Sequence, residues 1–176
     1  MIGCRVSSEF AMDIIVDGYN LIGSQTGLSG NLEHKRSWLV QQLASYQRRK
    51  GHSVTVVFDG WRAGWSHETK DKSDGVSIIY SRVGEKADSV VVRLARQLGG
   101  GCVVVTSDRE VRNAVERFGA VALFAAEFSD MLRDPAVSFA DDEPENLARA
   151  APKKGNPRRL SKKERKRREK LHKLKS

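Results

Sequence analysis

Apolar residues in the first 134 positions fall into short runs separated by stretches with helical spacing. Five runs rich in β-branched residues are typical of buried strands, and they lie at 13–17, 54–58, 76–80, 102–106 and 120–124. Apolar residues recur every three or four positions elsewhere, which predicts helices over 31–50, 84–98, 107–118 and 126–132. Strands that alternate with helices form right-handed βαβ units, so the pattern predicts an α/β fold: a mostly parallel five-stranded sheet with helices on both faces.

The connections between these elements also carry signals. Ser107 and Glu110 have the spacing of a capping box, which predicts that Ser107 begins the helix that follows. The segment 21–30 is rich in Gly and Ser, and we expect a loop there. The segment 61–75 is polar and carries Trp61, Arg62 and Trp65 without periodicity. Long loops of this kind are often functional.

Three of the predicted strands lead directly to an acid. Asp17 ends the first run, Asp59 follows the second, and Asp108 lies just beyond the fourth. Asp88 falls in the first turn of the helix at 84–98, away from its apolar face. Because the carboxyl ends of parallel strands meet at one edge of a sheet, we expect the four acids to converge there, with Asn20 nearby.

Each acid also has an ordinary structural explanation. Asp17-Gly18 and Asp59-Gly60 are dipeptides typical of hairpin turns, and Asp88 and Asp108 are favoured near the positive ends of helices. The strand–helix alternation argues against hairpins and places all four acids at the same edge. The arrangement taken as a whole therefore indicates a functional site more strongly than any single acid does.

Four carboxylates packed together repel one another at neutral pH, and a divalent cation relieves that repulsion. Carboxylate and amide oxygens are the ligands that Mg²⁺ or Mn²⁺ prefers. We expect Asp17, Asp88, Asp108 and Asn20 to bind such an ion, with Asp59 completing the catalytic acids. An ion of this kind promotes hydrolysis of phosphodiesters, which makes a nucleic acid the expected substrate.

Four short motifs then point to a known family: Asp17-Gly-Tyr-Asn20, Phe58-Asp59, Gly84-Glu85-x-Ala87-Asp88 and Thr106-Ser-Asp108. In this order they resemble the YacP-like branch of the NYN domain ribonucleases, relatives of the PIN nucleases. The resemblance covers about residues 12–134. It implies a PIN-like three-layer α/β/α fold, metal-dependent endoribonuclease activity, and an association of some members with ribosomes and messenger RNA.

The resemblance also implies roles for individual residues. It places Asp17, Asp59, Asp88 and Asp108 on the acidic site of the family. Asn20 and Glu85 fall on its supporting polar positions, and we add Ser107, the predicted helix cap, as a third supporting residue. Lys86 lies inside the Glu-x-Ala-Asp motif at a position where the family varies.

Charge is distributed unevenly along the chain. The net charge is +9, yet residues 151–176 alone carry 13 Lys and Arg against 2 Glu, so the body is close to neutral. We expect a domain at 12–134, a linker at 135–160, and a basic tail at 161–176 that is disordered or becomes helical on binding a polyanion. Residues 1–11 show no period and are expected to be disordered, and Met12 is a second candidate start.

The basic residues near the acids and in the tail are the expected contacts to RNA. They are Arg62, Lys86, Arg109, Lys162, Lys163, Arg165, Lys166, Arg167 and Arg168. A flexible basic tail would hold RNA near the site without changing the chemical step. Removal of the tail after Ala150 would then weaken binding and leave cleavage at saturating RNA near normal.

Three functions from different classes can be weighed against these features. The first is a cytoplasmic endoribonuclease that acts on single-stranded RNA, with the ribosome as a further partner. The second is a catalytically silent RNA- or ribosome-binding protein of the same fold, although such a protein would need none of the four acids. The third, a DNA-directed flap or 5′-exonuclease, would require a longer helical arch than 176 residues accommodate.

The amino-acid composition indicates the cellular compartment in which we expect the protein. Two cysteines give no disulfide framework, which is typical of a reducing cytosol. No stretch approaches the roughly 18 apolar residues of a membrane span, so we expect no membrane partner.

Overall fold

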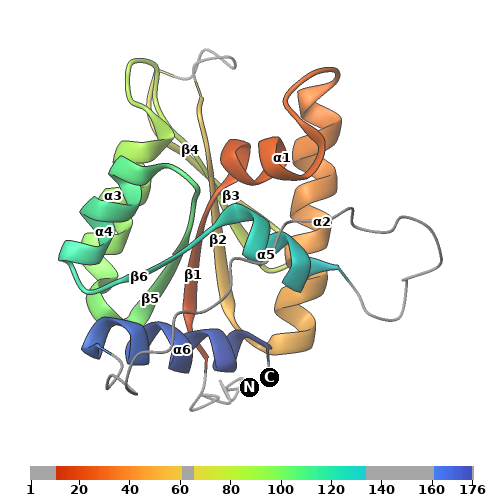
Figure 1. Cartoon of the computed structure of the whole chain (residues 1–176). Coiled ribbons are helices and arrows are strands. Elements are labelled where there is room, and N and C mark those ends of the chain that lie inside the picture. The colour runs from red at the N-terminus through yellow and green to blue at the C-terminus, as the bar shows by residue number, and fades with distance from the viewer. Residues whose placement is uncertain (1–10, 61–65, 134–160, 176) are drawn as a thin grey trace, which may run out of the picture.

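The structure is a computed structural model that describes residues 11–60, 66–133 and 161–175. Six strands form one sheet in the order β3-β4-β2-β1-β5-β6 (Figure 1). The strands are β1 (Asp13–Asp17), β2 (Ser53–Phe58), β3 (Thr69–Ser73), β4 (Val76–Tyr80), β5 (Cys102–Val105) and β6 (Val121–Leu123). All neighbours pair in parallel except β3 and β4, which are antiparallel. The predicted α/β fold with a mostly parallel sheet is confirmed.

Strand β3 is the element that the sequence pattern missed, because 69–73 was predicted to be part of a loop. The strand is polar on both faces, as suits a charged edge strand, so it has no apolar alternation. Asp74 and Gly75 connect it to β4 in a two-residue turn, with φ of 49° and 92°. Two positive φ angles with an Asp-Gly dipeptide are the signature of a type I′ hairpin. The Asp-Gly dipeptide was the part of this signature that the sequence shows.

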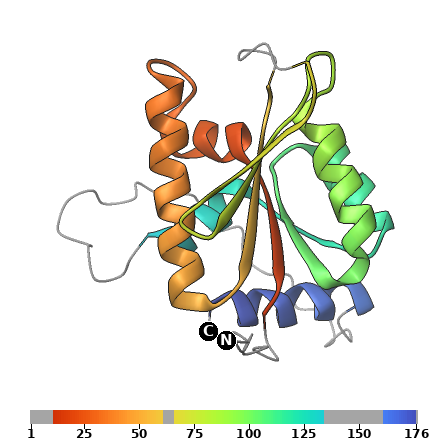
Figure 2. The same ribbon diagram turned by 180° about the vertical axis from the view of Figure 1, so that it is seen from behind.

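Six α-helices and one 3₁₀ turn accompany the strands in the described residues. They are α1 (Gly18–Thr26), α2 (Leu32–Lys50), α3 (Ala87–Leu98), the 3₁₀ turn (Gly99–Gly101), α4 (Arg109–Arg117), α5 (Ala125–Leu132) and α6 (Lys162–Lys175). Helices α1, α2 and α5 cover one face of the sheet and α3 and α4 cover the other, as the two views show (Figures 1 and 2). The molecule is therefore a three-layer α/β/α structure.

Alternate residues of the strands pack into two separate hydrophobic cores, one on each face of the sheet. Ile14, Val16 and Val56 pack against α1, α2 and α5 on one side of the sheet. Ile15 and Val57 point to the other side, where they pack against α3 and α4. Burial on both faces explains why these strands read as continuous apolar runs.

Helix α1 corrects a second prediction, since the loop expected at 21–30 begins as a helix that continues to Thr26. Its Gly and Ser residues concealed the helix, but Leu21 and Ile22 are fully buried. Gly18 is required where the chain turns into α1, because a Cβ there would lie 2.2 Å from the ring of Phe58. The turn that carries Asp17 is thus held tightly against β2.

The start of α4 differs by one residue from the predicted capping box. Asp108 caps the helix: its Oδ1 accepts hydrogen bonds from the backbone N–H groups of Glu110 (2.7 Å) and Val111 (3.0 Å). Ser107 lies outside the helix, and its Oγ accepts a hydrogen bond from the N–H of Ala125 at 3.3 Å. An Asp at the cap bonds the same orphan donors as Ser would, and the pattern could not separate the two.

The C-terminal segment differs most from expectation, because residues 162–175 form helix α6 and pack against the body. Leu174 is fully buried, and its carbonyl oxygen accepts a hydrogen bond from the hydroxyl of Tyr46 (3.0 Å). The ammonium group of Lys170 donates to the carbonyl oxygens of Gly100 (2.9 Å) and Cys102 (2.7 Å). The tail predicted to be disordered without a partner is therefore a docked helix in the structure.

Helix α6 crosses the sheet at the amino ends of its strands, below β1 in both views (Figures 1 and 2). Its contacts lie just before β6 at Gly119, at the start of β5, and just before β2 at His52. A helix with few apolar residues of its own is thus held largely by polar contacts, in which its lysines donate to carbonyls of the body and its own carbonyls contact Tyr46 and His52. The segment 1–11, predicted to be disordered, lies outside the described residues except for Ala11, and the predicted linker 135–160 lies wholly outside them.

Candidate active site

The acids predicted from the sequence lie around the carboxyl edge of the sheet, at the opposite end from α6. Asp17 is the last residue of β1, and Asp59 directly follows β2. Asp108 lies in the turn between β5 and α4, and Asp88 is the second residue of α3. Since β1 pairs with both β2 and β5, their ends are neighbours in the sheet.

Asp17 is the most buried of these acids, at 6% exposure. The pKa of its carboxyl is raised to about 7, mainly by burial and also by the charges of Asp88 and Asp59. Hydrogen bonds from the N–H of Asn20 (3.2 Å) and the hydroxyl of Thr106 (3.4 Å) oppose the shift. The folded protein therefore holds a carboxylate that is costly to charge unless a cation is present.

Asp88 belongs to the same electrostatic cluster from the other face of the sheet. Burial raises its pKa, and the charges of Asp108 and Asp59 add to the shift, while Lys86 opposes it. Asp88 is thus repelled by Asp59 and Asp108, and its own charge repels Asp17, so the carboxyl of Asp88 interacts with all three other acids.

Asp59 has a clear positioning contact. Its Oδ1 accepts a 2.6 Å hydrogen bond from the N–H of Ala87, the first residue of α3. This bond fixes the start of α3, and with it Asp88, against the end of β2. Gly60 is required beside it, because a Cβ there would lie 1.8 Å from the carbonyl oxygen of Ser81.

Thr106 was not assigned a role from the sequence, and it connects two of the acids. Its hydroxyl is fully buried, donates to Oδ2 of Asp17 and accepts from the N–H of Asp108 at 3.1 Å. One side chain therefore sets both the orientation of Asp17 and the path of the chain into Asp108. A hydroxyl residue directly after a run of buried valines was the available signal.

The predicted supporting residues bind backbone and arginine groups. Oδ1 of Asn20 accepts a 2.8 Å hydrogen bond from the N–H of Ser107, which ties α1 to the β5–α4 turn. The carboxylate of Glu85 pairs with Arg93 at 3.1 Å and Arg82 at 3.4 Å, which fixes the loop before α3. Asn20, whose amide oxygen was predicted to bind metal, is thus engaged in holding the turn.

The predicted RNA contacts fall into three groups. Lys86 and Arg109 are exposed at the acid edge, two residues before Asp88 and directly after Asp108 in the chain. Arg62 lies outside the described residues. The six tail residues are on α6, at the other end of the sheet from the acids.

The acids do not form a ready-made metal cage. Across residues 11–60, 66–133 and 161–175, no three Asp, Glu, His or Cys side chains come close enough together to hold a metal ion. Mg²⁺ is usually bound through one or two carboxylates, with water and substrate phosphate completing the octahedron. The donor set fits that mode of binding, with buried Asp17 as its centre, and it does not bring the predicted ligands Asp17, Asp88, Asp108 and Asn20 into one shell.

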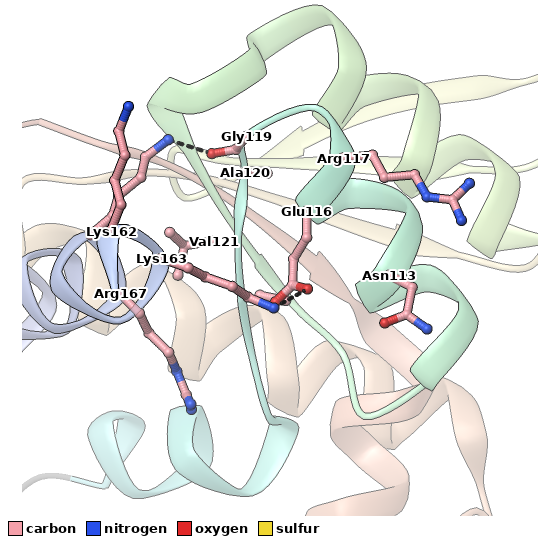
Figure 3. Close-up of a pocket in the computed structure, with 11 residues that line it drawn as sticks. Asn113, Glu116, Arg117, Gly119, Ala120, Val121, Lys162, Lys163 and Arg167 are labelled. Atoms are coloured by element: carbon pink, nitrogen blue, oxygen red, sulfur yellow. Dashed lines mark hydrogen bonds and ion pairs between the residues drawn. The ribbon is translucent and has the colours of Figure 1, made fainter. Parts of the chain in front are cut away.

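A second feature is a cationic cavity of about 670 Å³ between α4, β6 and α6 (Figure 3). Lys163 reaches Glu116 across it at 2.7 Å, and Lys166 donates to the carbonyl oxygen of Gly119 at 2.6 Å. One guanidinium nitrogen of Arg167 donates to both carboxylate oxygens of Glu127 on α5, at 2.8 Å each. Five cations line the cavity: Arg117, Lys162, Lys163, Lys166 and Arg167. Several tail residues predicted to bind RNA therefore also bind the body.

Comparison with known proteins shows the family to which the fold belongs. The sequence matches the YacP-like NYN domain over residues 14–175. The chain belongs to the YacP-like NYN domain family. The match extends through α6, beyond the range 12–134 that the sequence motifs cover, so the docked helix lies within the family match.

YacP of Bacillus subtilis, compared by its sequence and by two crystal structures, supports the assignment. The chain is 35% identical over 124 residues to the uncharacterized protein YacP, a match that covers 66% of this chain and 72% of the relative. Two crystal structures of Rae1 (YacP) are similar at 30% identity. The structure of a point mutant has a TM-score of 0.58, and the match covers 69% of this chain and 74% of that one. The structure without the mutation has a TM-score of 0.55, with 68% and 72% covered.

Membership of the YacP-like NYN family gives the chain a nuclease-like, RNA-related function. In the part of the chain that the structure describes, no helix has the length and apolar character needed to cross a bilayer.

Proposed function

We propose that this protein is an endoribonuclease that hydrolyses single-stranded RNA with Mg²⁺ or Mn²⁺ bound at the acid edge. The observation that carries the proposal is the state of Asp17. Its carboxyl is buried beside Asp88 and Asp59, and its pKa is raised to about 7. A protein gains nothing in stability from crowding acids in this way, whereas a site for a divalent ion and a phosphodiester requires it.

Each acid has a part in the proposed site. Asp17 would contact the ion directly, and Asp88 and Asp108 would act on it through its bound waters and their negative charge. The ion when bound would polarise a phosphoryl oxygen and help to activate water. Asp59 fixes the start of α3, which carries Asp88, through its bond to the N–H of Ala87. Thr106 and Asn20 hold the β5–α4 turn, which carries Asp108.

The basic residues would orient the RNA. Lys86 and Arg109 are exposed next to Asp88 and Asp108, where they can contact phosphates on either side of the cleaved bond. The exposed cations of α6 would form a second contact to RNA, with the ribosome as a source of such RNA. We place this activity in the cytoplasm, in keeping with the unpaired, buried Cys102.

The proposal is tested by incubating the full-length protein with labelled single-stranded RNA and with single-stranded DNA of the same sequence. The reactions contain Mg²⁺, Mn²⁺ or EDTA. We expect internal cleavage of RNA with either ion and none with EDTA. Absence of RNA cleavage with both ions, or equal cleavage in EDTA, would contradict the proposal.

A second candidate is a catalytically silent protein that binds RNA or the ribosome. It is favoured by the cation-lined cavity at α6 and by the lack of a three-ligand cluster among the described acids. The same experiment separates the two functions, because this protein would bind RNA but leave it intact with either ion.

A further inference from the structure

Phe124 is an exposed aromatic residue at the acid edge of the sheet. It directly follows β6, whose last residue, Leu123, pairs with Val105 of β5. The carbonyl oxygen of Leu123 accepts a hydrogen bond from the N–H of Thr106 at 3.0 Å. Phe124 therefore lies beside the turn that leads from Thr106 to Asp108.

Arg112 holds the ring of Phe124 from α4. The guanidinium carbon of Arg112 lies 3.6 Å from the ring centroid, a close cation–π contact. Arg112 is four residues beyond Asp108, so it lies one helical turn above Asp108 on the same face of α4. The pair thus borders the proposed catalytic site on the β6 side.

The backbone of Phe124 is fixed, although its side chain is outside both cores. Its N–H donates to Oε2 of Glu127 at 3.1 Å, and its carbonyl oxygen accepts from the N–H of Phe128, also at 3.1 Å. Glu127 is itself held by Arg167 of α6. The residue as a whole remains 39% exposed on this rigid support.

A rigid, exposed aromatic ring beside a cation is suited to one kind of ligand. Unpaired bases of RNA stack on aromatic side chains and on guanidinium planes, and such stacking tolerates any base. We infer that Phe124, held by Arg112, is a stacking platform for an RNA base next to the phosphodiester that is cleaved. This inference rests on the proposed function, and it adds the element that would select single-stranded over paired RNA.

The chain provides a matched control at the other end of the sheet. Phe118 is 37% exposed and lies beneath Arg96, with 5.8 Å between the guanidinium carbon and the ring centroid. It follows α4 and precedes β6, so it faces the amino edge of the sheet, away from the acids. Phe118 and Phe124 thus differ in position and not in kind.

The test uses a single-stranded RNA with one 2-aminopurine, whose fluorescence falls when the base stacks. Binding is measured in EDTA, so that no cleavage occurs. Loss of base stacking should weaken RNA binding about 5- to 150-fold in Phe124→Ala and Phe124→Leu, and abolish the quenching at one position of the label. Phe124→Trp should keep both, and Phe118→Ala should behave as wild type. Phe124→Leu retains apolar packing, so it remains informative if Phe124→Ala is unstable.

Cleavage assays separate this inference from the proposed function. With Mg²⁺ or Mn²⁺, we expect Phe124→Leu to raise KM and to leave kcat within about threefold of wild type. Wild-type RNA affinity in Phe124→Leu, or an equal loss of RNA affinity in Phe118→Ala, would contradict the stacking role of Phe124. Neither result would contradict the proposed nuclease activity. If the wild-type protein binds RNA with position-specific quenching but cleaves none, the stacking role of Phe124 is supported and the proposed nuclease activity is contradicted. If it binds no RNA, both are contradicted.

Discussion

The burial of Asp17 lowers the free energy of unfolding at neutral pH. Its carboxyl has an ordinary pKa of 3.8 when exposed and a pKa of about 7 in the fold, mainly because of burial. The folded state therefore binds more protons at Asp17 than the unfolded state does between these values. Stability contributed by protonated Asp17 is present at low pH and is lost as pH rises through about 7.

This linkage gives a prediction for Asp17→Asn in EDTA. Charging Asp17 at pH 8 costs the folded state on the order of 4 kcal/mol, at about 1.36 kcal/mol for each unit of pKa. We expect the variant to be more stable than wild type at pH 8, by about 1–3 kcal/mol after the loss of hydrogen bonds. The advantage should shrink as pH falls from 7 toward 4. Urea denaturation at several pH values measures this, and equal stabilities across that range would contradict it.

Thr106 provides a second prediction at this scale. Thr106→Val keeps the volume but removes the hydroxyl that donates to Asp17 and accepts from the N–H of Asp108. We expect a loss of about 1–3 kcal/mol in stability, because the buried donor loses its partner. Cleavage should fall about tenfold or more, because both acids lose their orientation. Thr106→Ser should restore most of the activity, and a Val variant as active as wild type would disprove the role.

Among the elements, those with buried apolar faces could be predicted from the sequence and those held by polar contacts could not. Strands β1, β2, β4 and β5 are apolar on both faces, and all were predicted. Strand β3 has charges on both faces, and α6 is docked through Lys170, Tyr46 and backbone carbonyls. Hydrophobic periodicity carries no record of such contacts.

The residues of the candidate site also divide into those whose position could be predicted from the sequence and those whose position could not. The four acids could be predicted because each follows a strand or begins a helix, and parallel pairing brings such positions together. Thr106, Phe124 and Arg112 could not, because their roles depend on distances between different elements. The Ser107 cap was misplaced by one residue because Asp108 competes for the same N–H groups.

The docking of α6 predicts the effect of shortening Leu174. Its side chain is fully buried at the amino edge of the sheet. We expect Leu174→Ala to lower the free energy of unfolding by about 2–5 kcal/mol, and Leu171→Ala, which is only partly buried, by less. Truncation after Ala150 should therefore destabilise the domain and not merely weaken binding. Chemical denaturation tests this, and a wild-type midpoint for Leu174→Ala would show that α6 is not docked in solution.

At the scale of the whole molecule, the acids and α6 occupy opposite ends of the sheet. A strand of five residues spans about 17 Å, so a cation on α6 cannot touch a phosphate bound at the acids. The basic residues of α6 would instead hold a different part of the RNA. Arg165 and Arg168 suit this role, because they are exposed and make no ion pair with the described part of the chain.

Neutralising these two arginines gives a prediction about salt. For single-stranded RNA, the log–log dependence of affinity on salt changes by about 0.7 for each phosphate contact. We expect Arg165→Gln with Arg168→Gln to weaken binding and to flatten the salt slope by about 1.4, with kcat unchanged. The control replaces Lys70 and Lys72 of β3, at the far edge of the sheet, and should bind as wild type. Identical salt slopes for wild type and the α6 variant would show that these two arginines do not contact RNA phosphates.

The most direct test of the account is single-turnover cleavage of saturating single-stranded RNA by acid variants in Mg²⁺ or Mn²⁺. Asp17→Asn and Asp108→Asn should each lose at least about 100-fold in rate, because the bound ion contributes several kcal/mol to the chemical step. Both should still bind RNA and remain folded. Asp130→Asn, which changes an exposed acid on α5, should cleave as wild type. Wild-type rates in the Asp17 and Asp108 variants would contradict the proposal that the acid edge is the catalytic site.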